Sequence, residues 1–553
     1  MKNIFKYTAL VAGLALLCVS CDNKLNTPPV GSLSSLGYFS TPSHIEEGIR
    51  GAYAKLTGIE TDMYSYLSET RSDNIFADPA PNATREGTEI GHYRFNESQG
   101  QLKNVWAGWY SVIYNANNVL ENLENVEFTN DAVKKQFRGE LLFLRAYAHF
   151  ELVRVFGNVP IVDHVLGTAE SKEIKQSAGA DVLNTRVIPD LKEAIGLIPY
   201  RASMLSNTGG SAANEYRADK LAAQAMLARV YMTLYGWPYN DASVKSEAKN
   251  LLKTVVDYAI ANGYYAPNAT EWKKMFTTDR ATQNKYFIFS FQHTGSTPTG
   301  LAFVTCAEAL TVDYLPTQVT NSRYNGNAMY TGFVEATLRY EYQETGDERG
   351  AFCIIDTMAP VGAYKGYSNR ETEFTLDNGD KITAYERSIN TKWIPYAAKR
   401  ESVGVDFDDL TLGSGWPMNF PIIRTEDMML LYAELLIEDG DITGAMDIVN
   451  QIRERAGVEL RPTDCSAAEA LNYVKKERKL EFFGEGIRWF DEIRYGEWKE
   501  ATTKMLNRYI NSSNSSYTAT VSTVSVVDGK YLCPIPESEM LSVAGLYVQN
   551  PGW

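Results

Sequence analysis

Apolar side chains recur at helical spacing along much of this chain, most clearly between Lys135 and Phe156. Positions three or four residues apart form one apolar stripe there, and neighbouring apolar positions widen it. A stripe this wide predicts a helix that is buried on more than one side. Gly157 and Pro160 follow, and a glycine with a proline behind it is typical of a helix end. The stripe consists of Phe137, Leu141, Leu144, Ala148, Leu152 and Val155, and it is widened by Leu142, Val153 and Phe156.

The same periodicity predicts further helices in pairs. One pair covers about 218–235 and 243–261, and a second covers about 425–440 and 442–456. Small alanines at the helix contacts and the short turn inside the second pair resemble tetratricopeptide repeats, which are helix–turn–helix units of about 34 residues. Each such unit leaves an apolar face that a neighbour must cover, so several units must stack. Long insertions separate these units, so the sequence does not predict a clean array.

The middle of the chain, residues 283–399, lacks this helical pattern. Lys285–Phe291 has the composition of a strand, and a stretch rich in Gly, Thr, Ser, Asn and Tyr continues to Tyr330. Loops this long inside a compact body are usually functional or disordered. We therefore predict a mainly α fold with long irregular loops and a few short strands.

The first residues form a secretory leader. Lys2 and Lys6 precede a nearly unbroken apolar run that ends at Ser20 and Cys21, and this run is too short to span a bilayer. Cleavage before a cysteine is typical of bacterial lipoproteins, so we predict a signal peptide over residues 1–20 and lipidation at Cys21. Residues 21–35 are polar and contain two prolines, which indicates a flexible tether. The alternative is an ordinary cleaved signal that ends near a cysteine.

Composition narrows the classes of function. The chain has 553 residues, of which 44% are hydrophobic and 22% charged, as in globular proteins. Its net charge of −15 argues against a nucleic-acid-binding protein, which needs a positive face for phosphates. The chain contains 34 Tyr and 9 Trp, and although most must lie in the core, a sugar-binding surface would draw on such rings.

The sequence offers little support for an enzyme. It contains no HExxH, GxSxG or P-loop motif, and its histidines are scattered. His149 falls inside the apolar helix and is predicted to be a hydrogen-bonded core residue. A glycosidase carboxylate pair remains open, because carboxylates are numerous. The mature cysteines beyond Cys21 form no CxxC pattern, and we expect buried small side chains more than disulfides. These are Cys306, Cys353, Cys465 and Cys533.

Six blocks, taken in order, resemble the SusD/RagB family of outer-membrane lipoproteins. RGELLFLRAYAHFELVRVFGNVPIV is similar to the family's central helix, and VKKERKLEFFGEGIRWFDEIRYGEW closely matches its E-R-x-x-E…E-G-x-R-W-x-D segment. The blocks span Arg50–Leu56, Trp106–Leu123, Arg138–Val162, Ile422–Leu436, Val474–Trp498, and the closing Pro534–Met540 with Gln549–Trp553.

This resemblance implies a tetratricopeptide-like scaffold at about 41–265 and 422–500, with a variable ligand face at about 283–420, all within one domain of residues 36–553. It implies a surface lipoprotein that captures an oligosaccharide and delivers it to a SusC-like TonB-dependent transporter of the outer membrane. A RagB-like capture of peptides shares that architecture, and a surface glycoside hydrolase is the rival from another class. We expect no catalysis and no required metal or cofactor, although a bound Ca²⁺ would suit so acidic a chain.

Two variable segments are candidates for ligand contacts. Family members often place sugar contacts after a block like Ser72-Asp73-Asn74, although a carboxylate such as Asp73 can equally cap a helix or turn. The second segment is rich in aromatic residues that packing alone explains poorly. The candidates are Asp73, Arg85, His92, Tyr93, Phe95 and Asn104 in the first segment, and His293, Tyr314, Tyr324 and Tyr330 in the second.

Charges of alternating sign at near-helical spacing mark the block at 474–498. We interpret them as an ion-pair network that holds the last helices to the scaffold, in preference to a catalytic carboxylate pair. Arg145 and Arg154 lie in a strongly apolar helix and also require partners. The network is predicted to contain Arg478, Glu481, Glu485, Arg488, Asp491 and Arg494.

Overall fold

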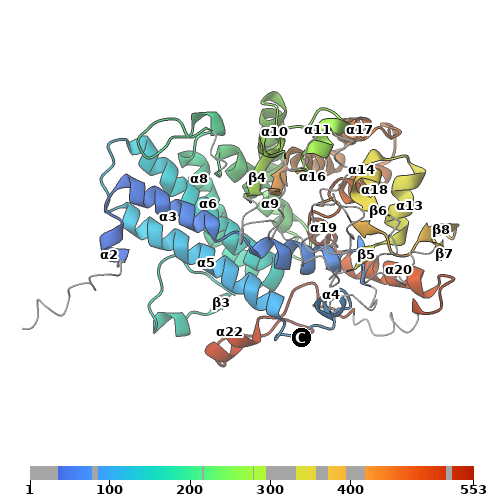
Figure 1. Ribbon diagram of the computed structural model, residues 1–553, viewed down its shortest axis with the longest axis horizontal. Helices are drawn as coiled ribbons and strands as arrows, with labels where there is room; N and C mark the ends of the chain where they lie inside the picture. Colours follow the sequence, from blue (N-terminus) through green and yellow to red (C-terminus); the bar gives the residue numbers. More distant parts are fainter. Residues whose placement is uncertain are drawn as a thin grey trace, which may run out of the picture.

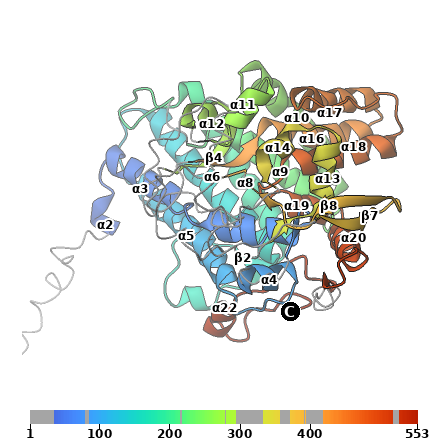
Figure 2. The ribbon, with the colours of Figure 1, turned by 45° about the vertical axis from the view of Figure 1, so that its right-hand side comes forward.

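The structure is a computed structural model that describes residues 35–77, 85–213, 217–277, 279–293, 332–355, 371–390, 392–393, 418–517 and 526–553. The described chain is mostly helical, with short strands, as the periodicity predicts. Figure 1 shows long helices from the first part of the chain (blue to teal) at the left, and the strands β7 (Glu371–Thr375) and β8 (Lys381–Tyr385) at the right. Figure 2 shows the same arrangement turned by 45°.

The long helices form one continuous row. Along this row α3 and α6 pack on α5, and α6, α8, α9, α10, α16 and α17 then follow as successive neighbours, with α18 packed on both α16 and α17. Helix α10 contacts α16 although the intervening chain is long, so the array that the sequence interrupts is continuous in space. Their bounds are α3 (Pro42–Ala54), α5 (Gly100–Leu123), α6 (Asp131–Phe156), α8 (Ile188–Leu197), α9 (Lys220–Tyr235), α10 (Lys245–Ala261), α16 (Thr425–Glu438), α17 (Ile442–Arg455) and α18 (Ala467–Glu481).

The ends of these helices follow their local sequence. The Asn130 side chain accepts from the Ala132 amide at the start of α6, and Gly157 ends that helix at φ 69°, where only glycine fits without strain. Ser466 and Glu469 cap the start of α18 reciprocally, which satisfies backbone donors that the first turn leaves without partners. The predicted bounds of the helix at 135–156 are therefore confirmed at its C-terminal end, and α6 begins four residues earlier.

The strands form five two-stranded antiparallel sheets within the described residues. The pairs are β1 with β5, β2 with β3, β4 with β10, β6 with β9, and β7 with β8. The predicted strand at 285–291 is confirmed as β4 over Phe287–Phe291, whereas Lys285 and Tyr286 belong to the end of α12 (Arg280–Tyr286). The bounds are β1 (Ile75–Phe76), β2 (Val159–Pro160), β3 (Gln176–Ser177), β4 (Phe287–Phe291), β5 (Phe333–Val334), β6 (Ile354–Ile355), β7 (Glu371–Thr375), β8 (Lys381–Tyr385), β9 (Ile389–Asn390) and β10 (Phe420–Arg424).

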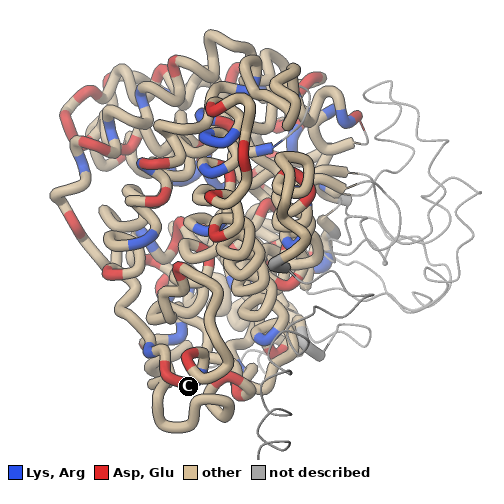
Figure 3. The backbone as a smooth tube through the Cα atoms, turned by 90° about the vertical axis from the view of Figure 1, so that its left-hand side faces the viewer, with Lys and Arg blue, Asp and Glu red and all other residues tan. Residues whose placement is uncertain are grey.

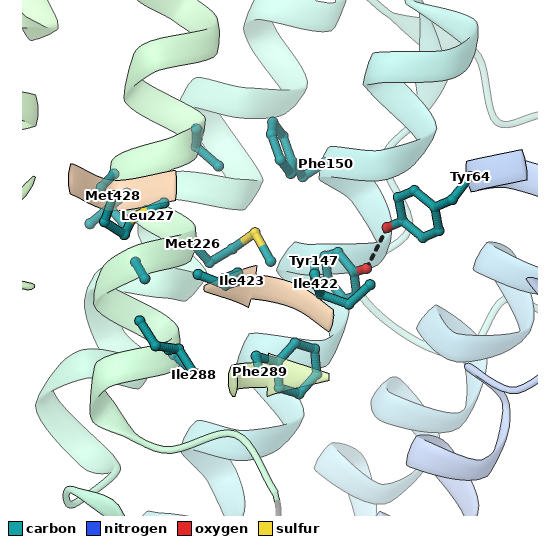
Figure 4. Close-up of a cluster of buried hydrophobic side chains, with 14 of the residues drawn as sticks. Tyr64, Tyr147, Phe150, Met226, Leu227, Ile288, Phe289, Ile422, Ile423 and Met428 are labelled. Atoms are coloured by element: carbon teal, nitrogen blue, oxygen red, sulfur yellow. Dashed lines mark hydrogen bonds between the residues drawn. The ribbon is translucent and has the colours of Figure 1, made fainter. Parts of the chain in front are cut away.

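The centre of the core lies where the β4–β10 sheet meets α6 and α9 (Figure 4). Phe289 of β4, Ile423 of β10 and Met226 of α9 are at most 3% exposed. The Tyr64 and Tyr147 hydroxyls lie 2.6 Å apart at the edge of this cluster, which satisfies two buried polar groups. The apolar stripe of α6 therefore packs against both helices and strands, which explains its width.

A second, smaller core lies beyond the helical row. The β7–β8 hairpin packs there with α13 (Ala336–Glu344) and α20 (Trp498–Ile510) around buried Phe374 and Tyr509. The remaining helices are short. They are α2 (Ser35–Tyr38), α4 (Arg85–Gly91), α7 (Gly179–Val182), α11 (Ala269–Lys274), α12 (Arg280–Tyr286), α14 (Glu348–Cys353), α19 (Arg488–Arg494) and α22 (Glu537–Ser542), with single turns at Thr61–Tyr66, Glu69–Arg71, Glu170–Lys172, Leu183–Val187, Arg201–Ser203 and Ala242–Val244.

Three expectations from the sequence concern membranes and thiols. Within the described residues, none of the helices combines the length and the apolar character that a membrane span requires. Cys353 and Cys533 are buried, Cys465 is half-buried, and these three form no disulfide with one another. The signal peptide, Cys21 with most of its tether, and Cys306 lie outside the described residues.

Candidate functional site

Short strands bring together the points where the variable segments join the scaffold. Ile75 and Phe76 pair with Val334 and Phe333, so the chain before residue 78 lies beside the chain after residue 331. Phe291 pairs with Phe420 in the β4–β10 sheet, next to the other end of the same middle segment. Sequence-distant segments are thus held at one side of the helical row, as a ligand face built from loops requires.

Side chains reinforce this junction. The His293 backbone amide donates to the Asn419 side chain over 3.0 Å. The Asn419 backbone amide in turn donates to the Gln283 side chain over 3.1 Å. The His293 ring is buried, with its Nε2 3.6 Å from a Glu60 carboxylate oxygen. Burial raises the pKa of Glu60 to about 7. His293, a predicted ligand residue, therefore lies inside the junction with its ring covered by protein.

The predicted residues of the first segment are mostly buried. The Tyr93 hydroxyl donates to the Arg71 carbonyl over 2.7 Å, and its ring is fully covered. Phe95 lies against Trp553 with ring centroids 4.5 Å apart. His92 is 1% exposed, with a ring nitrogen 2.6 Å from the Ala77 carbonyl, and burial lowers its pKa to about 4. These rings form a packed wall behind the junction and present no open face for stacking.

The other predicted residues are scattered. Asn104 is exposed on α5, where its amide donates to Asp62 over 2.8 Å. Arg85 is the first residue of α4. Tyr314, Tyr324 and Tyr330 lie outside the described residues.

Asp73 is the predicted residue that reaches a pocket. Arg488 donates to both of its carboxylate oxygens over 2.8 and 3.0 Å, and the Lys479 ammonium lies 2.9 Å away. Burial alone would raise the pKa of Asp73, but Arg488 and Lys479 outweigh it and hold that pKa well below its ordinary value. The side chain is therefore an ionised partner in an ion-pair cluster and does not cap a helix.

An open pocket of about 510 Å³ lies in front of Asp73. Helices α13, α18 and α20 and the turn of the β7–β8 hairpin form its walls. Lys476 pairs with Glu341 over 2.7 Å, and Arg508 pairs with Asp377 over 3.0 Å, so donors and acceptors alternate around the rim. The complete lining is Asp73, Thr337, Tyr340, Glu341, Glu344, Thr345, Leu376, Asp377, Asn378, Lys476, Lys479 and Arg508.

Tyr340 supplies the aromatic ring of this pocket. It is half-buried on α13 and packs against the smaller core, while burial and nearby Glu344 raise its pKa, so the phenol stays neutral. Sequence reasoning missed Tyr340 because it falls in a short helix with polar neighbours. The signal that could have found it is the combination of an aromatic residue with several carboxylates a few residues after Tyr330, inside the predicted variable face at about 283–420.

The predicted ion-pair network is confirmed, and it is buried. Glu481 contacts Arg349, Arg424 and Arg455 over 2.7, 2.9 and 2.6 Å. Burial alone would raise the pKa of Glu481, but the three guanidinium groups hold it well below its ordinary value. The network also joins Glu485 to Arg424 and Lys392, Arg478 to Asp427 and Asp491, and Arg494 to Glu434.

The polar groups inside α6 also have partners. Arg145 donates to both carboxylate oxygens of Asp190 over 2.7 and 2.8 Å, and Arg154 pairs with Glu151. His149 accepts from the Val162 amide over 3.2 Å, and burial lowers its pKa to about 3. The structural interpretations of Arg145, Arg154 and His149 are confirmed.

Charged residues of both signs are interspersed along the described chain (Figure 3). Among the described residues, the structure contains no group of three or more His, Cys, Asp or Glu side chains arranged to hold a metal ion. Three carboxylates of the pocket, Asp73, Glu341 and Asp377, pair instead with Lys or Arg. What the site offers is a polar surface of paired charges around a neutral ring.

Known proteins of the same size share this chain's sequence pattern and fold. A SusD-like protein, P38, from Formosa agariphila is 24% identical over 89% of this chain and 91% of its own. A SusD homolog from Bacteroides thetaiotaomicron has a TM-score of 0.72 at 21% identity, covering 94% of this chain and 98% of its own. Surface glycan-binding protein A from the same organism, solved with laminarihexaose, has a TM-score of 0.67 at 19% identity, covering 92% and 100%.

Two family profiles match the chain in succession. One, described as starch-binding associating with outer membrane, matches residues 20–232. The other, described as the SusD family, matches residues 307–553. Together with the shared fold, these matches show that the chain is a member of the SusD/RagB family.

Proposed function

We propose that this protein is a surface lipoprotein of the outer membrane that binds an oligosaccharide and delivers it to a SusC-like TonB-dependent transporter. A relative solved with laminarihexaose and a family profile that describes starch binding support the ligand class. The binding step involves no chemistry on the ligand. Solved relatives are described as a laminarin-binding and a glycan-binding protein, which supports this assignment without an enzymatic step.

The open pocket beside Tyr340 is the observation on which the ligand class depends. A sugar presents an apolar ring face and several hydroxyls, so it suits a surface with one aromatic ring and many paired donors and acceptors. The pocket of about 510 Å³ has room for part of an oligosaccharide. Its rim ion pairs are exposed enough for ligand hydroxyls to bridge them, since Lys476 and Glu341 are 43% and 24% exposed.

Binding by the mature protein tests this proposal. Residues 22–553 are titrated with a panel of oligosaccharides, starting with laminarihexaose, by calorimetry. We expect Tyr340→Ala to reduce affinity by about 1–3 kcal/mol, by analogy with ring stacking on bases. The matched control is Tyr114→Ala, because Tyr114 is a 52% exposed tyrosine outside the pocket. Equal affinities of the two variants would place the site elsewhere.

The same titration separates the rival ligand classes. Capture of peptides predicts binding to a peptide panel and none to the glycans. A glycoside hydrolase predicts new reducing ends when purified protein is incubated with a bound glycan. Either result would overturn oligosaccharide capture while leaving the family membership intact.

Anchoring rests on Cys21. Because acyl chains contribute about 0.8 kcal/mol per buried CH₂, removing the acylated thiol should release the protein from membranes. We expect Cys21→Ala to move the protein to the soluble fraction, and Cys18→Ala to leave it in the membrane fraction. Protease added to whole cells tests surface exposure, and co-purification with a transporter tests the partner.

A further inference from the structure

A second cavity lies beside α19, the helix whose first residue, Arg488, pairs with Asp73. It has a volume of about 120 Å³ and lies where the ends of α6 and α9 meet α19 and residues 531–532. Its walls are mainly apolar. None of the residues that line the open pocket takes part in it. It is therefore a separate feature from the proposed oligosaccharide site.

Aromatic rings make up much of its wall. Trp237 and Tyr531 meet edge to face with centroids 4.6 Å apart, and Tyr239 and Phe490 line the cavity beside them. The Arg154 guanidinium lies over the Phe490 ring, 3.7 Å from its centroid, and both side chains line the cavity. Ring edges and faces thus surround the space, an environment that favours another ring.

Four polar side chains in the wall already have hydrogen-bond or ion-pair partners. Arg154 pairs with Glu151, and Arg494 pairs with Glu434 and Asp491. The Asn158 side chain accepts from the Gly179 amide over 3.1 Å, and the Thr233 hydroxyl donates to the Arg229 carbonyl over 2.9 Å.

Three donors in the wall have no hydrogen-bond partner among the described residues, namely the hydroxyls of Tyr239 and Tyr531 and the indole N–H of Trp237. Neither hydroxyl hydrogen-bonds to another side chain or backbone group in the described part of the chain. Burial raises the pKa of Tyr239 and of Tyr531, so both hydroxyls remain neutral donors at physiological pH. The hydroxyls of Tyr239 and Tyr531 are therefore half-buried donors with which a ligand in the cavity can form hydrogen bonds.

We infer that this cavity binds one small neutral aromatic molecule with a polar substituent, of which phenol is the simplest example. Its size supports this class, since a cavity of about 150 Å³ lined by apolar side chains holds a benzene ring. A sugar ring is disfavoured, because its several hydroxyls would find only the two tyrosine hydroxyls and the Trp237 indole N–H without a partner in the described residues. Charged ligands are disfavoured, because the wall arginines are neutralised by their carboxylates.

The occupant is a free molecule and not the side chain of a protein partner. A protein interface extends well beyond one pocket and surrounds it with apolar surface. None of the large hydrophobic side chains that are exposed in the described residues lines this cavity. Those side chains are Tyr114, Ile260, Leu460, Ile510, Val527, Leu541 and Val548.

Titration of residues 22–553 with phenol, benzene and cyclohexanol tests this inference by ligand-observed NMR. For ligands this small we expect phenol to bind with a Kd of about 0.1–1 mM. Benzene should bind more weakly, and cyclohexanol, which keeps the hydroxyl but lacks the aromatic ring, should not bind. Thr233→Leu places a larger side chain in the cavity and should abolish phenol binding.

Tyrosine variants that keep the rings test the two donors. Tyr239→Phe and Tyr531→Phe should each reduce phenol affinity by roughly five-fold, as the loss of one hydrogen bond implies, and leave benzene affinity unchanged. The matched control is Tyr235→Phe, which removes a hydroxyl at the end of α9 that bonds to Glu438 outside the cavity. Thermal scans confirm that each variant is folded.

Three outcomes would overturn the inference. They are no phenol binding by the folded protein, equal binding by the Thr233→Leu variant, and equal binding of cyclohexanol. If neither tyrosine substitution changes the phenol affinity, the two hydroxyls do not contact the ligand. The inferred hydrogen bonds to the polar substituent are then refuted. Oligosaccharide affinity should be the same in all these variants, so this inference and the proposed function fail independently.

Discussion

Helix α18 separates two regions built from the same residue types. On one face, Glu477, Arg478 and Glu481 are at most 2% exposed and join the buried ion-pair network. On the other face, Lys476 and Lys479 line the open pocket. One helix therefore holds the fold together on one side and presents charges to solvent on the other.

The difference lies in burial and in the number of partners. Glu481 contacts three guanidinium groups, and removing one partner from a buried cluster strands charges that have no access to water. Lys476 makes one ion pair near the surface, where water competes and the net contribution is small. A buried cluster of carboxylates and arginines thus stabilises the fold. An exposed cluster contributes little to stability, and its charges are accessible to a ligand.

The largest expected effect is on stability. Glu481→Gln leaves Arg349, Arg424 and Arg455 with less negative charge, so we expect the free energy of unfolding to fall by about 3–5 kcal/mol. The control is Glu344→Gln in the open pocket, where we expect a change below about 0.5 kcal/mol. Denaturant unfolding followed by circular dichroism measures both, and similar losses would abolish the distinction between the two faces.

The same substitution should change the response to acid. The pKa of Glu481 is held below its ordinary value of 4.5, so its contribution to stability is present above that pH and is lost as the pH falls. We expect wild-type stability to decline more steeply than that of Glu481→Gln between pH 5 and pH 3. Unfolding curves across this range check the prediction, and parallel declines would contradict it.

A smaller effect is expected at the border between the two regions. Lys479 pairs with Asp73, which keeps Arg488 as a second partner. We expect Lys479→Met to reduce stability by about 1 kcal/mol and to weaken oligosaccharide binding about ten-fold. Calorimetry and denaturant unfolding on the same preparation separate the two effects. A stability loss as large as that of Glu481→Gln would assign Lys479 to the buried network.

The smallest effect on stability is expected at the rim. Lys476→Met removes one exposed ion pair, so the free energy of unfolding should change by less than about 1 kcal/mol. Ligand affinity should fall about three-fold, and the loss should shrink at high salt, because the pair is screened there. Titrations at low and high ionic strength check this. A large stability loss without a change in affinity would contradict the assignment of this face to binding.

Helical periodicity was enough to predict the long helices, because wide apolar stripes such as that of α6 depend on local spacing. It was also enough to predict that Arg145 and Glu481 need partners, because charges in apolar or strongly patterned segments rarely stand alone. The identity of those partners was not predictable, since Asp190 and Arg424 lie far away in sequence. Continuity of the helical row depends on the contact between α10 and α16, which no local pattern encodes.

The candidate ligand residues were predicted less well. Tyr93 and His92 occupy a polar, loop-like stretch, yet Arg71 and Trp489 cover that stretch from distant parts of the chain. Exposure depends on such tertiary contacts, so it could not be derived from loop composition. Asp73 reaches the open pocket, and the ring in the same pocket comes from α13, which lies inside the predicted variable face. The roles of Arg85, Asn104, Tyr314, Tyr324 and Tyr330 stay predictions.

The contact between α10 and α16 has a consequence for how this chain can diversify. Packing of these two helices fixes the ends of the chain that runs between Ala261 and Thr425. Once the ends of a loop are fixed, doubling its length raises the entropic cost of closure by only about 0.6 kcal/mol. Insertions and deletions in the loops of that stretch, outside its packed helices and strands, should therefore cost little in folding free energy. The proposed ligand face can change its loops while the packed helices beneath it keep their register.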